Sequence, residues 1–94
     1  MPEPFRILTT PHFERDVRKL TRRNPRLLTL LEQVFAILKE GPTNRTGKHD
    51  IKKLGGVNPG EGQWRIRSGE YRLRYDIFDR EVVLYSFRHR KEAY

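Results

Sequence analysis

The chain has 94 residues, a formal net charge of +8 and a sequence pI near 10.3. This length suits one domain, and the 35% of apolar residues can build a small core. The lack of cysteine excludes disulfides, thiolate nucleophiles and cysteine-based zinc sites. The three histidines lie far apart without metal-ligand spacing, so we expect no metal and no cofactor. The basic balance favours an anionic partner such as nucleic acid, with a merely solubilising surface as the alternative.

The start of the chain carries no targeting signal. Met1 is followed by Pro2-Glu3-Pro4 rather than by a basic stretch and an apolar run. We therefore expect no secretory signal, no transmembrane segment and a cytoplasmic location.

Two helices are expected after a short first strand at residues 5–9. Thr10-Pro11 favours a helix start, because threonine caps a helix and proline suits the first helical position. Asn24-Pro25 repeats the signal for a second helix, which Gly41-Pro42 ends. So short a break predicts a helical hairpin.

Residues 43–62 are rich in glycine and predict a loop, in which residues 51–54 could form a short strand. Strands are expected at 63–68, 71–78 and 81–88, with a turn at Asp79-Arg80. The segregated elements predict a single α+β domain over residues 1–94, in which an N-terminal strand, a helical hairpin and a three-stranded antiparallel meander form one sheet. The helices should cover the face that holds Trp64, Ile66, Tyr71, Leu73, Tyr75 and Ile77.

The hairpin over residues 63–75 gathers arginines on its other face. Because side chains alternate along a strand, Arg65 and Arg67 share that face with Arg72 and Arg74. With Ser68-Gly69 as a two-residue loop, Arg65 lies opposite Arg72. Like charges directly opposite destabilise a sheet, and a bound phosphate backbone would remove the conflict. The alternative is an exposed strand face balanced by acidic neighbours.

Basic residues before the hairpin extend this candidate RNA site. Lys48, Lys52 and Lys53 are expected to contact the nucleic-acid backbone, and a solvated charged loop is the alternative.

The tail after the last strand carries His89, Arg90 and Tyr94, which could return beside the arginines. Histidine can transfer a proton near neutral pH, and a tyrosine can do so where nearby cations lower its pKa. A frayed basic terminus without a role is the alternative.

These segments resemble the RelE/ParE superfamily of toxins from bacterial and archaeal toxin–antitoxin pairs. The resemblance covers almost the whole chain. It rests on Lys53-Leu54-Gly55-Gly56, on the hairpin from Trp64 to Tyr75 and on the ending from His89 to Tyr94.

The RelE branch implies a metal-independent endoribonuclease that cleaves mRNA in the ribosomal A site by attack of the 2′-hydroxyl on the scissile phosphate. Carried over by motif, the catalytic residues would be Arg65, Arg72, Arg90 and Tyr94, with His89 in the place of the histidine of related branches. Arg67 and Arg74 would bind RNA. Lysines on the first hairpin strand of some members correspond here to Gln63 and Arg65, so the general base stays open.

Two other functions remain open at this stage. The ParE branch shares the fold but poisons DNA gyrase without this catalytic set, and a catalytically inactive RNA-binding module is a third reading. Arg72, Arg90 and Tyr94 favour the RelE branch. The resemblance also implies a cognate antitoxin, expected to be acidic and to wrap the basic surface, with the ribosome and mRNA as further partners.

Overall fold

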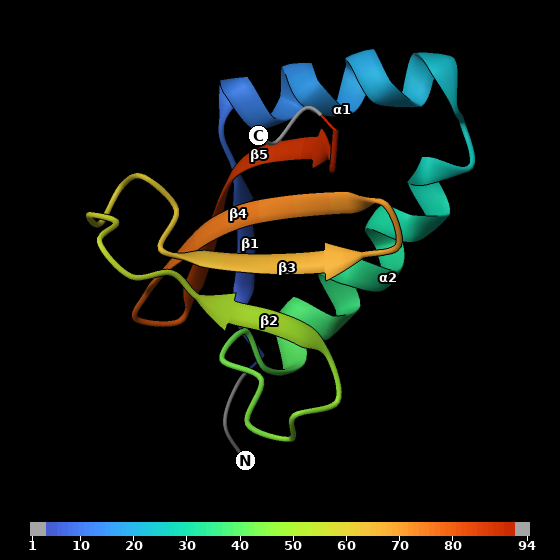
Figure 1. The fold of residues 1–94 in the computed structure, drawn as a ribbon. Coiled ribbons are helices and arrows are strands. Elements are labelled where there is room, and N and C mark those ends of the chain that lie inside the picture. Colours follow the sequence, from blue (N-terminus) through green and yellow to red (C-terminus); the bar gives the residue numbers. More distant parts are fainter. Residues whose placement is uncertain (1–3, 92–94) are drawn as a thin grey trace.

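The computed structural model describes residues 4–91, which form two helices and one five-stranded sheet (Figure 1). The elements are β1 (Arg6–Thr9), α1 (Pro11–Arg23), α2 (Leu27–Glu40), β2 (Asp50–Lys53), β3 (Trp64–Ser68), β4 (Tyr71–Phe78) and β5 (Glu81–His89). The strand order is β1-β5-β4-β3-β2, with β1 parallel to β5 and the other pairs antiparallel. The predicted α+β class is confirmed, and β2 adds a full strand beside the meander.

The helix starts differ in how closely they follow the expected signals. Thr10 caps α1, because its Oγ1 accepts a hydrogen bond from the Phe13 amide at 3.2 Å. Asn24 instead forms a tight turn, in which its side chain accepts from the Arg26 amide at 3.3 Å. As a result α2 begins at Leu27, two residues later than Pro25.

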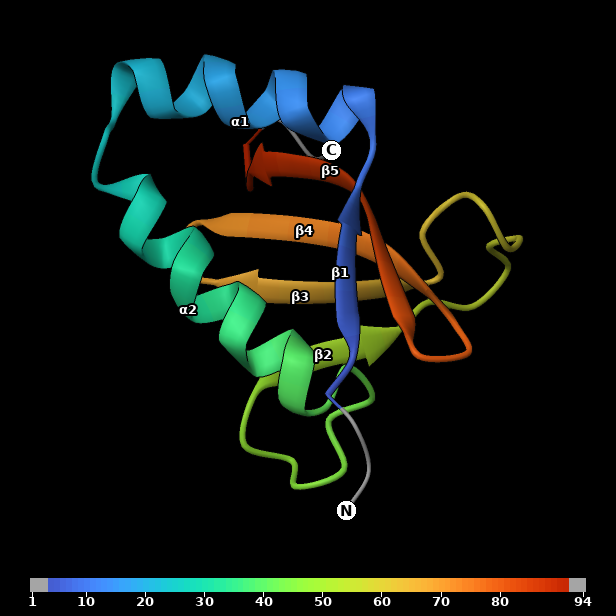
Figure 2. The same cartoon turned by 180° about the vertical axis from the view of Figure 1, so that it is seen from behind.

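The two helices take different positions on the sheet. Figure 2 shows α2 crossing one face of the sheet, while α1 runs along β5 at the edge. Phe13 of α1 joins the parts, since its ring lies 6.3 Å from that of Phe35 in α2 and 6.4 Å from that of Phe87 in β5. The two helices therefore cover different parts of the predicted face, α2 across the strands and α1 along β5.

The covered face holds the core. Ile66, Leu73 and Tyr75 are at most 1% exposed, and they pack with Val34 and Leu38 of α2 in one apolar cluster. The Tyr75 hydroxyl donates to the Pro42 carbonyl at 2.7 Å, which satisfies its one buried polar atom. Burial raises the pKa of this hydroxyl far above its ordinary value.

The β3–β4 hairpin has a different register from the one expected. Ser68 pairs with Tyr71, so the two-residue loop is Gly69-Glu70 rather than Ser68-Gly69. Gly69 takes φ +58°, as the first central residue of a type II′ turn requires. The prediction that Arg65 lies across from Arg72 is therefore wrong. Arg67 pairs with Arg72, and Arg65 pairs with Arg74.

A β-bulge interrupts the alternation of β5. Arg74 pairs with Ser86 and Tyr75 pairs with Leu84, which leaves Tyr85 as the extra residue. A bulge of this kind shifts the residues that follow it to the other face of the sheet. Phe87 accordingly turns toward the helices, where it is 1% exposed, and Arg88 pairs with Arg72 on the opposite side.

Candidate nucleic-acid interface

Three arginines lie side by side across the middle of the sheet. The strand register pairs Arg67 of β3 with Arg72 of β4, and Arg72 with Arg88 of β5. We call these residues the arginine row. Directly opposed side chains have Cβ atoms about 5 Å apart, so each pair brings like charges together and weakens the sheet.

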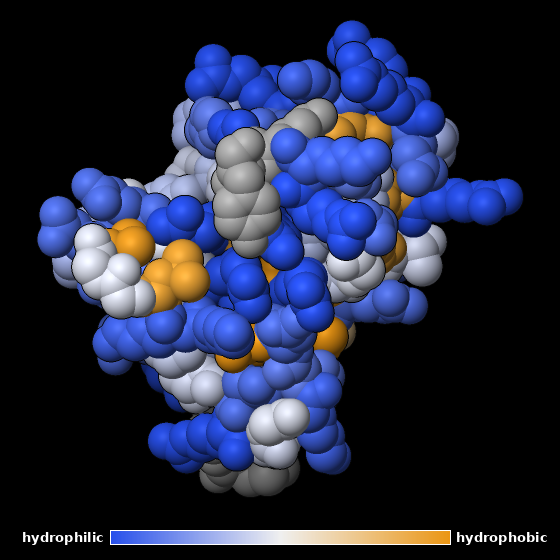
Figure 3. Space-filling model, viewed as in Figure 1, coloured by the Kyte–Doolittle hydropathy of each residue, from blue (hydrophilic) through white to orange (hydrophobic). Residues whose placement is uncertain are grey.

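A second set of basic residues extends the row into a surface. Lys52, Arg65 and Arg74 occupy the next position on β2, β3 and β4 and face the same way. We call the six residues together the arginine face. Figure 3, which views this side, shows hydrophilic residues spread over the strands and few apolar ones.

One carboxylate neutralises part of this charge. Asp50 of β2 lies 3.1 Å from Nη2 of Arg65 and 2.7 Å from Nε of Arg67, each measured to a carboxylate oxygen. It bridges two arginines that would otherwise repel each other. Among the described residues, the buried Nε of Arg65 has no hydrogen-bond partner. A buried donor without a partner costs free energy.

The other end of the arginine face is built around Asp76. This buried carboxylate accepts hydrogen bonds from the amides of Gly60 at 2.5 Å and Gln63 at 2.7 Å, and so holds the loop before β3. Burial, followed by the charge of Asp76 and a hydrogen bond to it, raises the pKa of the Tyr85 hydroxyl. Asp76 is thereby engaged and does not neutralise the arginine row.

Arg74 is held by backbone oxygens. Its Nε donates to the Gly62 carbonyl at 2.9 Å and its Nη2 to the Glu61 carbonyl at 3.3 Å. Gly62 has φ +87°, and a Cβ there would lie 2.9 Å from Cβ of Arg74. The contact therefore needs glycine at this position.

The chemistry of the arginine face suits a phosphate backbone. Arginine stays protonated at any cellular pH, and its planar fork donates two hydrogen bonds to one phosphate. Successive phosphates along a strand of RNA can follow successive arginines, which replaces the repulsion within the row by attraction.

The structure brings together most of the predicted RNA-binding residues. Five of the six members of the arginine face were expected at the site, and Arg88 is the exception. The register also places Lys52 directly beside Arg65. Arg90 lies at the hairpin end of the surface, where its amide donates to the Glu70 carbonyl at 2.7 Å and its Nε lies 3.0 Å from the Glu70 carboxylate. Lys48 is exposed in the loop before β2, and Tyr94 lies outside the described residues.

Two predicted site residues lie on the helix side of the sheet instead. His89 is the last residue of β5, and its ring packs edge-on against Tyr71 at 5.2 Å. Lys53 places its amino group 5.9 Å from the ring of Trp64. The expectation that His89 returns beside the arginines is wrong, because the bulge at Tyr85 turns it away. Lys53 is separated from Lys52 by the ordinary alternation of β2.

Arg88 is the residue that the sequence reading missed. Counted by strict alternation from the buried Leu84, position 88 would face the helices. The sequence does contain one indication of the bulge. Leu84 and Phe87 are both apolar and both buried, and this requires one break in the alternation between them. Arg88 completes the arginine row, and its Nη2 lies 3.2 Å from Nε2 of His12 on α1.

A separate hollow of about 510 Å³ lies between the helices. Thr9 of β1, Phe13 and Val17 of α1, and Leu28 and Leu31 of α2 form much of its wall. Leu28 is 53% exposed at its rim. The hollow is apolar and lies apart from the arginine face.

Residues 4–91 contain no helix of the length and apolarity that would span a bilayer. In the same part of the chain, no three histidine, aspartate or glutamate side chains gather as metal ligands.

Comparisons with known proteins place this chain and its fold in a defined class. The family model of the ParE toxin of the type II toxin–antitoxin system parDE matches residues 7–94. A solved structure of the RelBE2 toxin–antitoxin complex from Mycobacterium tuberculosis matches at 30% identity and a TM-score of 0.71, over 92% of this chain and 98% of that one. The RelB–RelE antitoxin–toxin complex from Methanococcus jannaschii matches at 26% identity and a TM-score of 0.56, over 93% and 94%. No curated protein sequence matches.

The class is that of small toxins that act in pairs with an antitoxin. The chain belongs to the ParE toxin family, within the RelE/ParE superfamily, and is the toxin component of a type II toxin–antitoxin system.

Proposed function

We propose that this toxin is a metal-independent endoribonuclease that cleaves mRNA in the ribosomal A site. The observation that carries the proposal is the arginine row, in which Arg67, Arg72 and Arg88 oppose one another across three strands. Like charges opposed in this way weaken the sheet, and a bound phosphate backbone would offset the repulsion. The RelE/ParE superfamily includes ribonucleases, whose RNA substrate carries such a backbone. The proposed place of action is the cytoplasm.

The reaction fits a site made of arginines. The 2′-hydroxyl attacks the adjacent phosphorus, and negative charge builds up on the phosphate oxygens in the transition state. Arg72 and Arg88 would stabilise that charge, while Arg65 and Arg67 would position the strand. Arg90 at the hairpin end would hold a neighbouring phosphate.

The test is cleavage of a defined message on purified ribosomes. Wild type should cut within the A-site codon, and Arg72→Ala should lose most of the activity. Arg45→Ala serves as the control, because it removes one exposed arginine from the loop before β2. Equal cleavage by wild type and Arg72→Ala would contradict the proposed site, and RNA binding without cutting would indicate the inactive binding module.

The cognate antitoxin is a further part of the proposal. The structures of the two similar proteins are antitoxin–toxin complexes. We expect an acidic segment of the antitoxin to lie on the arginine face and to replace the RNA. Mixing the toxin with the product of the neighbouring open reading frame should abolish cleavage, and unchanged cleavage in the stable complex would place the antitoxin elsewhere.

Inhibition of DNA gyrase is the second candidate. The placement of His89 on the helix side favours it, because the predicted tail histidine is then unavailable as a base at the arginine face. A supercoiling assay separates the two functions. Loss of gyrase supercoiling at toxin concentrations that leave mRNA intact would select gyrase.

A further inference from the structure

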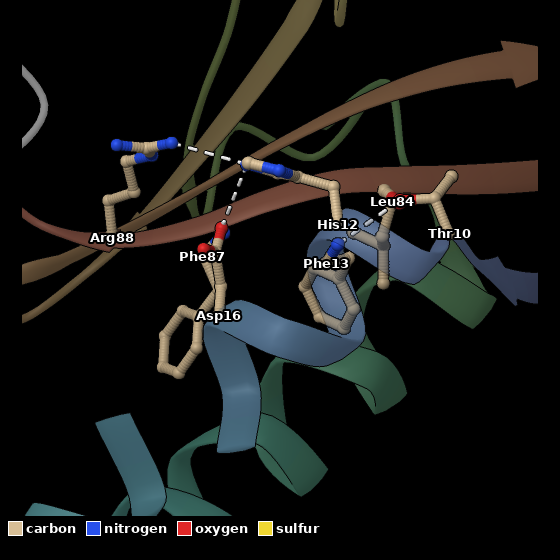
Figure 4. A network of polar contacts seen from close by, with 7 residues as sticks. All are labelled: Thr10, His12, Phe13, Asp16, Leu84, Phe87 and Arg88. Atoms are coloured by element: carbon tan, nitrogen blue, oxygen red, sulfur yellow. Dashed lines mark hydrogen bonds and ion pairs between the residues drawn. The ribbon is translucent and has the colours of Figure 1, made fainter. Parts of the chain in front are cut away.

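We propose that His12 is the general base of the site, a role that rests on the proposed ribonuclease function. The Nε2 atom of His12 lies 3.2 Å from Nη2 of Arg88, the outer member of the arginine row (Figure 4). His12 belongs to α1, far from the hairpin and the tail in the sequence. It supplies the proton acceptor that the strands themselves lack.

Two contacts fix the start of α1 against β5. The Thr10 hydroxyl donates to the Leu84 carbonyl at 3.0 Å, and the Phe87 amide donates to the Asp16 carboxylate at 3.0 Å. Beyond Leu84, β5 has no pairing with β1, so α1 takes over this edge. His12 lies between the two contacts, and its position follows from how α1 is attached (Figure 4).

The contact with Arg88 suits one tautomer of the imidazole. A guanidinium can only donate hydrogen bonds, so the contact is a hydrogen bond in the tautomer whose Nε2 carries the lone pair. A neutral ring with its lone pair directed at the arginine row is the form that a general base requires.

Asp16 is placed to stabilise the ring after it gains a proton. Its Oδ2 lies 3.5 Å from the same Nε2 atom. Among the described residues, Asp16 of α1 and Arg88 of β5 are the charged groups that contact His12. A proton gained at Nε2 would turn the contact with Asp16 into an ion pair and release Arg88 to the substrate phosphate.

His12 is also open to a substrate. Half of its side chain is exposed, so a ribose hydroxyl can approach the nitrogen. The other two histidines are less suitable, since His89 lies on the helix side and His49 is in the loop before β2. A substrate phosphate oxygen that accepts the hydrogen bond from Arg88 would replace Nε2 of His12 as the acceptor.

The step balances without a further reactant. Nε2 of His12 takes the proton of the 2′-hydroxyl while the 2′-oxygen forms a bond to phosphorus. The bond from phosphorus to the 5′-oxygen breaks, and that oxygen leaves with the electron pair and takes a proton from water. The products are a 2′,3′-cyclic phosphate and a 5′-hydroxyl end, and the imidazolium returns its proton to solvent.

Single-turnover cleavage on programmed ribosomes tests the role. His12→Gln should slow cleavage by roughly 10²- to 10⁴-fold at neutral pH, the range of a lost general base, with ribosome affinity unchanged. His49→Gln is the matched control and should keep the wild-type rate.

Two further measurements separate proton transfer from structure. Imidazole added to His12→Ala should restore part of the rate, which a structural role would not allow. A message in which sulfur replaces the 5′-oxygen leaving atom should still be cleaved slowly by His12→Gln.

The outcomes distinguish this inference from the proposed function. An active wild type with an equally active His12→Gln would overturn the role of His12 alone. Recovery of His12→Gln on the sulfur substrate would show that His12 protonates the leaving group instead. A wild type that cuts no message would overturn the ribonuclease and the role of His12 with it.

Discussion

The two faces of the sheet follow opposite rules along the same strand. On β4, Leu73 and Tyr75 point to the helices and are fully buried, whereas Arg72 lies between two other arginines. The first face gains free energy from apolar burial, and the second loses some through like charges. The comparison indicates that the helix side supplies the stability that the arginine face consumes. Adjacent residues on opposite faces should therefore give opposite phenotypes.

The largest effect is expected on the helix side. Leu73→Ala should lower the free energy of unfolding by about 2–5 kcal/mol, because it opens a cavity between Ile66 and Phe87. Urea unfolding measures the change. A loss below about 1 kcal/mol would mean that this face carries less of the stability than its burial indicates.

The neighbouring residue should affect cleavage instead. Arg72→Ala should reduce the cleavage rate by roughly 10²- to 10³-fold, as expected for one lost donor to transition-state charge. Its free energy of unfolding should stay within about 1 kcal/mol of wild type, because Arg67 and Arg88 lose a like-charged neighbour. Unfolding as severe as that of Leu73→Ala would break the contrast between the faces.

Alkaline pH should weaken the helix side. Burial raises the pKa of Tyr75, so the folded protein holds this proton more tightly than the unfolded chain does. The resulting stability is complete below the ordinary tyrosine pKa of about 10 and is lost as the pH rises above it. Tyr75→Phe should lower the free energy of unfolding by about 0.5–1.5 kcal/mol at neutral pH, because the hydrogen bond to Pro42 is lost. Above pH 10 the stability of this variant should fall less than that of wild type. Thermal unfolding against pH measures both, and parallel curves for the two proteins would contradict the role of Tyr75.

The smallest effect concerns two adjacent lysines. Lys52 belongs to the arginine face and Lys53 lies over Trp64 on the helix side. Lys52→Ala should reduce the slope of log affinity for single-stranded RNA against log salt by about 0.7, the contribution of one phosphate contact. Lys53→Ala should leave the slope unchanged. Equal slopes for the two variants would mean that RNA does not distinguish the faces.

The sequence was sufficient for the fold because its local signals agree. Alternation placed Ile66, Leu73 and Tyr75 on the covered face, and Thr10 and Gly41 marked helix ends where the structure has them. The hairpin register was missed because Ser68 and Gly69 could both begin a two-residue loop. The pairing of Ser68 with Tyr71 decides between the two loops, and Gly69 then takes the left-handed conformation at the first loop position.

The site was less predictable because it depends on contacts between distant segments. Arg65 and Arg72 could be assigned to the arginine face from alternation alone, since hairpin neighbours share a local pattern. Arg88 needed the bulge, and His12 needed the way α1 docks on β5. No local pattern in the chain encodes those contacts.

The bulge at Tyr85 lets β5 carry one extra residue without changing which side chains reach the site. Deleting Tyr85 would join Leu84 directly to Ser86, so strict alternation would still turn Phe87 toward the helices and Arg88 toward Arg72. Loss of the bulge with Tyr85 retained would instead turn Arg88 toward the helices and His89 toward the arginines. Relatives that lack this one residue would therefore keep the same basic side chains on the same face.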